Sequence, residues 1–165
     1  MKLTYCVLAG GCFWCIAYPY YNLDGVKKVY SGYSGGEEIN PSYKEVKSQK
    51  TTHRECIKIE YDEDVISYEE ILNLFFENIN PFDDGGQFID RGFSYTTAIF
   101  YRDEMMLETI NKIIEKVEIS SNQKVAVQVL KEDIFYLAED EHQEYALKNP
   151  EAMEQELIES GRKVK

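Results

Sequence analysis

The residues best able to do chemistry gather near the start of the chain, in Gly10-Gly11-Cys12-Phe13-Trp14-Cys15. An apolar strand that ends in two glycines and leads into a helix would put Cys12 at the helix N-terminus. Unpaired N–H groups and partial positive charge there favour a thiolate. We therefore expect Cys12 to have a depressed pKa and to act as a nucleophile. Phe13 and Trp14 would suit a small apolar group such as a methyl, although the same segment also fits a small buried cysteine among core aromatics.

Cys12 and Cys15 form a C-x-x-C pair, which is the spacing of thioredoxin-type redox sites. On a helix, this spacing brings both sulfurs to one face. The pair could equally be half of a zinc site, for which His53 and Cys56 are the only further ligand candidates nearby in the sequence.

Glu55 begins a segment, residues 55–62, in which apolar and polar residues alternate as in a half-buried strand. Alternation puts Glu55 on the same face as Ile57 and Ile59, and puts Cys56 on the opposite face. A carboxyl group held among apolar side chains has a raised pKa and suits a general acid. The alternative is a glutamate at a strand end whose carboxylate reaches solvent.

Tyr43 and Tyr95 stand where loops meet predicted elements, and their hydroxyl groups could polarise a developing oxyanion. The chain has 13 tyrosines, so composition alone does not select these two. Asp90 lies in a long aperiodic segment, residues 80–95, of the kind that is usually functional in a compact domain. An aspartate in such a loop also commonly caps a turn.

The segments that must position these residues alternate between strand and helix patterns. Strands are expected at residues 4–9, 26–34, 55–62, 96–101 and 124–130, and helices at residues 12–20, 43–48, 67–78, 103–119, 139–147 and 151–159. Helices interleaved with the strands of one sheet predict a two-layer α+β domain. The length predicts a single domain over residues 1–165.

The net charge of −12 argues against nucleic acid and against anionic membrane surfaces, because both require clustered Lys and Arg. No apolar run is long enough to span a bilayer. All four cysteines lie within the first 56 residues and no export signal precedes them. We therefore expect a cytoplasmic protein with reduced thiols rather than a secreted domain held by disulfides.

Five segments between residues 5 and 150 together resemble the A-type peptide methionine sulfoxide reductases. They are GGCFWC, GYSGGEEINPSYKEV, THREC with the following YDEDVISYEEIL, NPFDDGGQFIDRGFSYTTAIFY, and FYLAEDEHQEYALKNP. The resemblance implies an α+β two-layer sandwich with a ferredoxin-like mixed sheet at its core. It also implies an enzyme that reduces the S epimer of methionine sulfoxide, free or in proteins, with no metal and no organic cofactor.

The resemblance also implies site roles. Cys12 matches the nucleophile, and Glu55 matches the glutamate that protonates the sulfoxide oxygen, with Tyr43 and Tyr95 bonded to that oxygen. The residues implied to bind substrate are Phe13, Trp14 and Asp90. Methionine leaves, and Cys12 becomes a sulfenic acid, which a second thiol converts to a disulfide. Thioredoxin is the expected partner that reduces this disulfide.

The chain departs from the family pattern beside the nucleophile. Cys15 and Ala17 replace the glycine and glutamate of the common GCFWGxE, and no cysteine follows Cys56. The helical i, i+3 spacing makes Cys15 the predicted resolving thiol, with Cys56 or an external thiol as alternatives. Thr96 stands where the family has an arginine. A general C-x-x-C thiol–disulfide oxidoreductase remains the alternative enzyme, and a zinc-binding module is a third interpretation.

Overall fold

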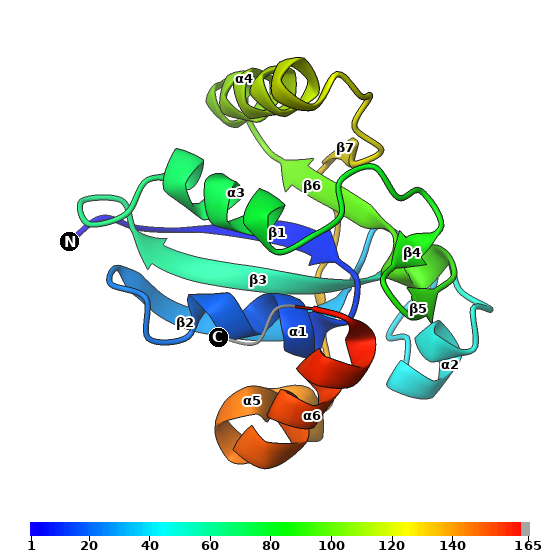
Figure 1. Ribbon diagram of the computed structural model, residues 1–165. Coiled ribbons are helices and arrows are strands. Elements are labelled where there is room, and N and C mark those ends of the chain that lie inside the picture. The colour runs from blue at the N-terminus through cyan, green and yellow to red at the C-terminus, as the bar shows by residue number, and fades with distance from the viewer. Residues whose placement is uncertain (163–165) are drawn as a thin grey trace.

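A six-stranded sheet forms the centre of the computed structural model, which describes residues 1–162 (Figure 1). The strands lie in the order β7-β6-β1-β3-β2-β8, and neighbours are antiparallel except for the parallel pair β6–β7. Their bounds are β1 Leu3–Gly10, β2 Val26–Ser34, β3 Arg54–Asp62, β6 Thr97–Tyr101, β7 Gln128–Lys131 and β8 Tyr136–Leu137.

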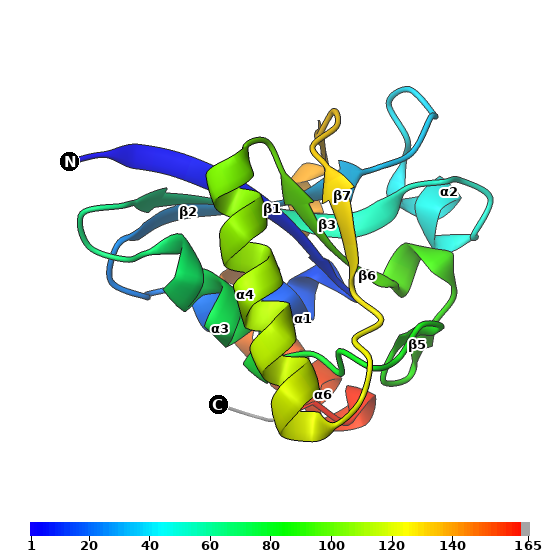
Figure 2. The same cartoon turned by 90° about the horizontal axis from the view of Figure 1, so that it is seen from above.

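Three helices cover one face of this sheet, namely α1 Phe13–Ala17, α3 Tyr68–Glu77 and α4 Glu104–Ser121 (Figure 2). Strand residues such as Leu8 and Ile57 are fully buried in the core cluster that these helices complete. The four central strands β6-β1-β3-β2, joined through α1 and α3, form the expected ferredoxin-like arrangement. The fold is thus α+β with two layers, as the sequence predicts.

The alternation predicted for residues 55–62 is confirmed in β3. Ile57 and Ile59 face the helices, while Cys56 lies in a separate buried cluster on the opposite face with Val7 and Phe100. This alternation puts Glu55 on the helix side of the sheet, where α1 begins.

Smaller elements surround the sheet (Figure 1). Helix α2 Tyr43–Lys47 and the paired strands β4 Gly86–Gln87 and β5 Asp90–Arg91 lie together beyond the end of β3 where Arg54 begins it. Helices α5 Tyr145–Lys148 and α6 Pro150–Ser160 lie below α1. Helix α2 begins with a capping box between Ser42 and Glu45, and this box fixes where the helix starts. No helix within residues 1–162 is both long enough and apolar enough to cross a membrane.

Two predicted elements are wrong in extent. The helix expected at residues 139–147 is a 3-10 turn, Asp140–His142, followed by the short α5, because Gln143 is extended and Glu144 has a φ of 52°. The Gln143 side chain is bonded to the backbone of Ser31 and Ala138, which holds the segment against β2. The strand expected at residues 124–130 begins only at Gln128.

The Gly10-Gly11 turn is closely packed. Gly11 has a φ of 89°, and a Cβ added there would lie 2.7 Å from Arg162 Nη2 and 2.8 Å from Gln87 Cβ. Gly11→Ala is therefore expected to lower the free energy of unfolding by about 1–3 kcal/mol, through backbone strain and steric overlap. Urea denaturation measures the loss.

Gly161→Ala is the matched control for Gly11→Ala. Gly161 also has a positive φ, but within the described part of the chain no atom lies within 4 Å of its added Cβ. A smaller loss than in Gly11→Ala is expected. Equal losses in the two variants would contradict the steric part of this explanation.

Candidate active site

Cys12 is the N-cap residue of α1, directly after the glycine turn, and its side chain is 7% exposed. Its carbonyl oxygen accepts hydrogen bonds from the backbone amides of Cys15 and Ile16, with an N···O distance of 3.1 Å in each case. These are the first hydrogen bonds of the helix. Met153 and Leu157 of α6 complete an apolar cluster around the two cysteines. The β1–α1 junction and α6 thus enclose the candidate nucleophile together.

The expected depression of the Cys12 pKa is wrong. Interaction with the Cys15 side chain, then burial, raises the pKa of Cys12 well above its ordinary value, and Asp90 adds to the rise. Helix α1 has only five residues, and the amide of Phe13 is already bonded to Glu55. A short helix whose first N–H group has another acceptor stabilises a thiolate only weakly. The raised pKa favours the thiol form of Cys12.

Glu55 is 1% exposed, and its Oε1 accepts the backbone N–H of Phe13 at 3.1 Å. Its Oε2 is buried and has no hydrogen-bond partner within residues 1–162. Burial first, and then Cys12, raises the pKa of Glu55 well above its ordinary value. The direction of the pKa shift agrees with the one expected from strand alternation, and this environment favours the protonated form of the carboxyl group beside Phe13.

Tyr43 and Tyr95 lie near this carboxyl group. Tyr43 is the first residue of α2, and Tyr95 ends the 3-10 helix Phe93–Tyr95. Burial first, and then Glu55, raises the pKa of both phenols, and Cys12 contributes to each rise. Both side chains are therefore neutral O–H donors at ordinary pH.

Asp90, on β5, is partly buried, and its Oδ2 has no hydrogen-bond partner within the described residues. Burial raises the pKa of Asp90, while Arg162 and Lys47 act in the opposite direction. Asp90 in turn contributes to the raised pKa values of Cys12 and Glu55. The structure thus brings this loop residue to the same site as the cysteine and the glutamate.

An aromatic wall lies beside Cys12. The ring of Phe13 is fully buried and stacks with Tyr43 at a centroid distance of 6.0 Å. The ring of Trp14 stacks on Tyr145 at 3.9 Å, and its Nε1–H donates to His142 Nδ1 at 3.1 Å. Trp14 is partly exposed and can therefore present apolar surface to a ligand.

Three residues of this wall were missed by the sequence analysis, namely Glu139, His142 and Tyr145. The Glu139 carboxylate accepts hydrogen bonds from the Tyr33 hydroxyl, at 2.8 Å, and from the Tyr43 backbone amide, at 3.0 Å. The second bond helps to position the start of α2. The only sequence signal for them is the block FYLAEDEHQEYALKNP, in which no single residue stands out.

Cys15 lies next to Cys12, as the helical spacing predicts. Their sulfur atoms and a carboxylate oxygen of Glu156 all lie within 4.8 Å of one another. Cys6 is fully buried in the main core, and Cys56 lies on the far face of the sheet. Neither belongs to the cluster that holds Cys12 and Cys15.

The zinc set that His53 and Cys56 would complete is not formed. His53 is buried, and its ring nitrogens are bonded to the Gly36 amide and the Glu38 carbonyl. Within residues 1–162, the only metal-type cluster that includes Cys12 and Cys15 has Glu156 as its third member.

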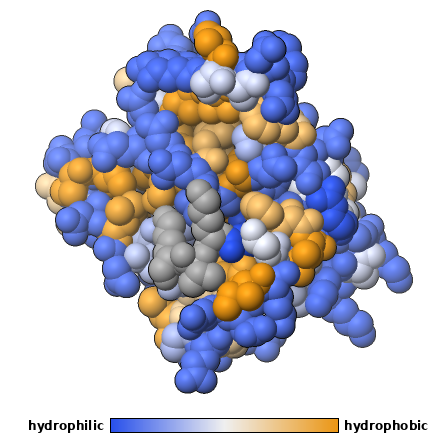
Figure 3. Space-filling view, in the orientation of Figure 1, coloured by the Kyte–Doolittle hydropathy of each residue, from blue (hydrophilic) through white to orange (hydrophobic). Residues whose placement is uncertain are grey.

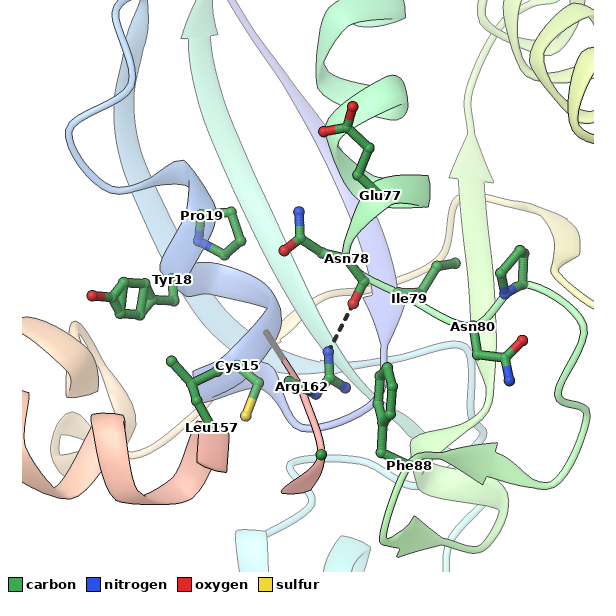
Figure 4. Close-up of a pocket in the computed structure, with 12 residues that line it drawn as sticks. Cys15, Tyr18, Pro19, Glu77, Asn78, Ile79, Asn80, Phe88, Leu157 and Arg162 are labelled. Atoms are coloured by element: carbon green, nitrogen blue, oxygen red, sulfur yellow. Dashed lines mark hydrogen bonds between the residues drawn. The ribbon is translucent and has the colours of Figure 1, made fainter. Parts of the chain in front are cut away.

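A cavity of about 430 Å³ opens on the other side of Cys15 (Figure 4). The Arg162 guanidinium lines it and donates to the carbonyl oxygens of Asn78, at 3.1 Å, and Gly10, at 2.9 Å. Phe88 contributes an aromatic wall beneath the guanidinium. Arg162 thereby ties the end of α6 to the glycine turn that carries Cys12. Figure 3 shows apolar surface across the middle of this face, with hydrophilic residues along much of its rim.

Comparison with known proteins gives one consistent result. A family model described as peptide methionine sulfoxide reductase matches residues 4–165. The peptide methionine sulfoxide reductase MsrA of Bacillus licheniformis is 44% identical over 98% of this chain and 90% of that protein. The peptide methionine sulfoxide reductase MsrA 2 of Staphylococcus aureus is 42% identical over 99% of this chain and 93% of that protein.

Solved structures agree with this result. Reduced Mxr1 from Saccharomyces cerevisiae is 31% identical, with a TM-score of 0.83 over 91% of this chain and 87% of that one. Methionine sulfoxide reductase A of Corynebacterium diphtheriae is 25% identical, with a TM-score of 0.80 over 90% of this chain and 76% of that one.

Proposed function

The chain belongs to the peptide methionine sulfoxide reductase family, and from that premise we propose that it reduces the S epimer of methionine sulfoxide, free or in proteins, to methionine. The observation that carries the proposal is the Glu55 carboxyl group, buried, raised in pKa and bonded to the amide that follows Cys12. A group that must deliver a proton at neutral pH needs such an environment.

Cys12 Sγ attacks the sulfoxide sulfur, while Glu55 donates its proton to the sulfoxide oxygen. The Tyr43 and Tyr95 hydroxyls donate hydrogen bonds to that oxygen as negative charge develops. The attack forms a bond between Cys12 Sγ and the substrate sulfur. The protonated oxygen then forms a bond to Cys12 Sγ as its bond to the substrate sulfur and the sulfur–sulfur bond break, so that methionine leaves and Cys12 carries a sulfenic acid. The proton lost by the Cys12 thiol restores Glu55, so that protons and electrons balance.

The substrate is held by groups around the nucleophile. The aromatic surface of Trp14, backed by Phe13, accepts the S-methyl group, and Asp90 helps to position the substrate. Phe13 is fully buried, and its part is therefore to support the wall formed by Trp14 and Tyr43.

Cys15 is the resolving thiol in this proposal. Its sulfur attacks the Cys12 sulfenic sulfur, a disulfide forms, and the hydroxyl group leaves as water with the Cys15 proton. The supporting observation is the distance between the two sulfur atoms, which is within 4.8 Å and requires only a small side-chain movement. A dithiol reductant of the thioredoxin class then restores both thiols by exchange. The yeast family member Mxr1 has a solved structure in complex with Trx2.

Cys15→Ser is expected to form methionine stoichiometrically, one per enzyme, and then to lose most thioredoxin-driven turnover. The reason is that no other described cysteine side chain lies close to Cys12. Rapid-quench counting of methionine and a steady-state thioredoxin assay separate the two steps. Unchanged thioredoxin-driven turnover would remove Cys15 from the resolving role.

The general thiol–disulfide oxidoreductase is not favoured, because the peptide methionine sulfoxide reductase family model and the MsrA relatives match nearly the whole chain. One assay separates the two functions. Incubation with dithiothreitol and a methionine sulfoxide peptide should remove one oxygen from the peptide, as read by mass spectrometry. Reduction of insulin disulfides without loss of peptide oxygen would support the alternative enzyme.

A cytoplasmic location and a single catalytic domain over residues 1–165 complete the proposal. All four cysteines are free thiols, which suits a reducing compartment. The family match extends over residues 4–165, which suits one domain. Neither nucleic acid nor a membrane is part of the proposed activity.

A further inference from the structure

Cys12, Cys15 and Glu156 bring three possible metal ligands together. Of these three residues, only Glu156 has no part in the proposed reaction. It lies on α6, close to the C-terminus, and its side chain is only partly exposed. One of its carboxylate oxygens lies within 4.8 Å of both the Cys12 and the Cys15 sulfur. Figure 4 shows the Cys15 sulfur pointing toward α6.

We propose that the reduced protein binds one thiophilic divalent cation of the Zn²⁺ type through Cys12 Sγ, Cys15 Sγ and the Glu156 carboxylate, and that this cation reversibly inhibits the reductase. The site differs in its ligands from a structural zinc module, and the cation is an inhibitor, not a resident cofactor. Inhibition rests on the proposed function, whereas cation binding does not.

The donor set suits such a cation. Zn²⁺ binds cysteine sulfur at about 2.3 Å and carboxylate oxygen at about 2.0–2.2 Å, so tetrahedral ligand atoms lie roughly 3.5–3.8 Å apart. The three atoms here, mutually within 4.8 Å, reach that spacing by small side-chain rotations. Three protein ligands leave a fourth position for water, as in open zinc sites.

The charges around the cluster favour a cation. A further carboxyl group, Asp90 on β5, acts on Cys12 and has a buried oxygen without a hydrogen-bond partner in the described chain. The positively charged side chains of Lys47 and Arg162 act on Glu156 and Asp90, and both oppose the binding of a metal cation. Binding displaces the protons of both thiols. The two thiolates and the Glu156 carboxylate then supply three negative charges directly to the dication.

The redox state would decide whether the site exists. A cation held by the Cys12 thiolate prevents its attack on a sulfoxide, and a Cys12–Cys15 disulfide removes both sulfur ligands. The cation should therefore occupy only the reduced enzyme, and oxidation to the disulfide should release it.

The test is a Zn²⁺ titration of protein reduced with a phosphine and desalted, in competition with a chromophoric chelator. One equivalent should bind to the reduced wild type and none to the disulfide form. Glu156→Gln should weaken binding by at least about tenfold, because an amide is a poorer ligand for Zn²⁺ than a carboxylate. Glu154→Gln, exposed on the same helix, should bind like the wild type. Co²⁺ should give a thiolate-to-metal absorption band that Cys15→Ser weakens.

Equal affinity in Glu156→Gln and wild type, or binding that survives oxidation, would overturn the proposed site. Reductase assays on the same samples separate the two proposals. Inactive protein that still binds Zn²⁺ through Glu156 would contradict only the reductase function. Active protein with no Zn²⁺ binding would contradict only the cation site.

Discussion

Replacing Cys12 with serine is expected to lower methionine sulfoxide turnover by at least about 1,000-fold, because a serine hydroxyl neither attacks a sulfoxide sulfur nor holds its oxygen as a sulfenic acid. The Cys12 side chain lies at the start of α1 with little exposed surface, so serine should fit without refolding the helix. Turnover is measured with dithiothreitol, so that loss of the thioredoxin step does not mask the result.

Cys6→Ala is the control for Cys12→Ser. Cys6 is fully buried in the main core, away from Glu55, and its loss should cost stability but leave most activity at a permissive temperature. Near-normal turnover in Cys12→Ser would contradict the assignment of the nucleophile.

Glu55→Gln is expected to lower kcat by about 100- to 1,000-fold, with a much smaller change in KM. The amide oxygen can still accept the Phe13 N–H, so the start of α1 should be preserved. What the amide lacks is an acidic proton for the sulfoxide oxygen. Steady-state kinetics at pH 7 with saturating dithiothreitol measures the two parameters separately.

Glu60→Gln is the matched control, since Glu60 lies on the same strand and accepts a hydrogen bond from the Tyr30 hydroxyl rather than from α1. It should leave kcat unchanged. A kcat for Glu55→Gln within threefold of the wild type would mean that another group protonates the oxygen.

The sequence predicts an element best when neighbouring residues along it already show which side chains are buried. Strand β3 begins one residue before its predicted start, and its successive residues alternate between two buried clusters. Strand β2 has the predicted bounds. The helix predicted around Gln143 is wrong because local sequence does not determine the conformation of this segment. Its conformation depends on hydrogen bonds to the backbone of Ser31, more than 100 residues away, and on the left-handed Glu144.

The residues of the candidate site likewise differ in whether the local sequence predicts them. Glu55 could be predicted from its place in an alternating strand, and Cys15 from helical spacing. The raised pKa of Cys12 could not, because only the folded chain shows that the Cys15 side chain contacts Cys12 and that burial and Asp90 add to the rise. Glu156 had no local signal at all, since it belongs to an ordinary acidic helix that happens to pack on the cysteines.

The most direct test of the central claim is the reduction of separate S and R epimers of a methionine sulfoxide peptide, with dithiothreitol as electron donor and the Cys12→Ser variant as blank. We predict turnover of the S epimer and none of the R epimer. Turnover of the R epimer alone, or of neither epimer by protein with four titratable thiols, would contradict the proposed function.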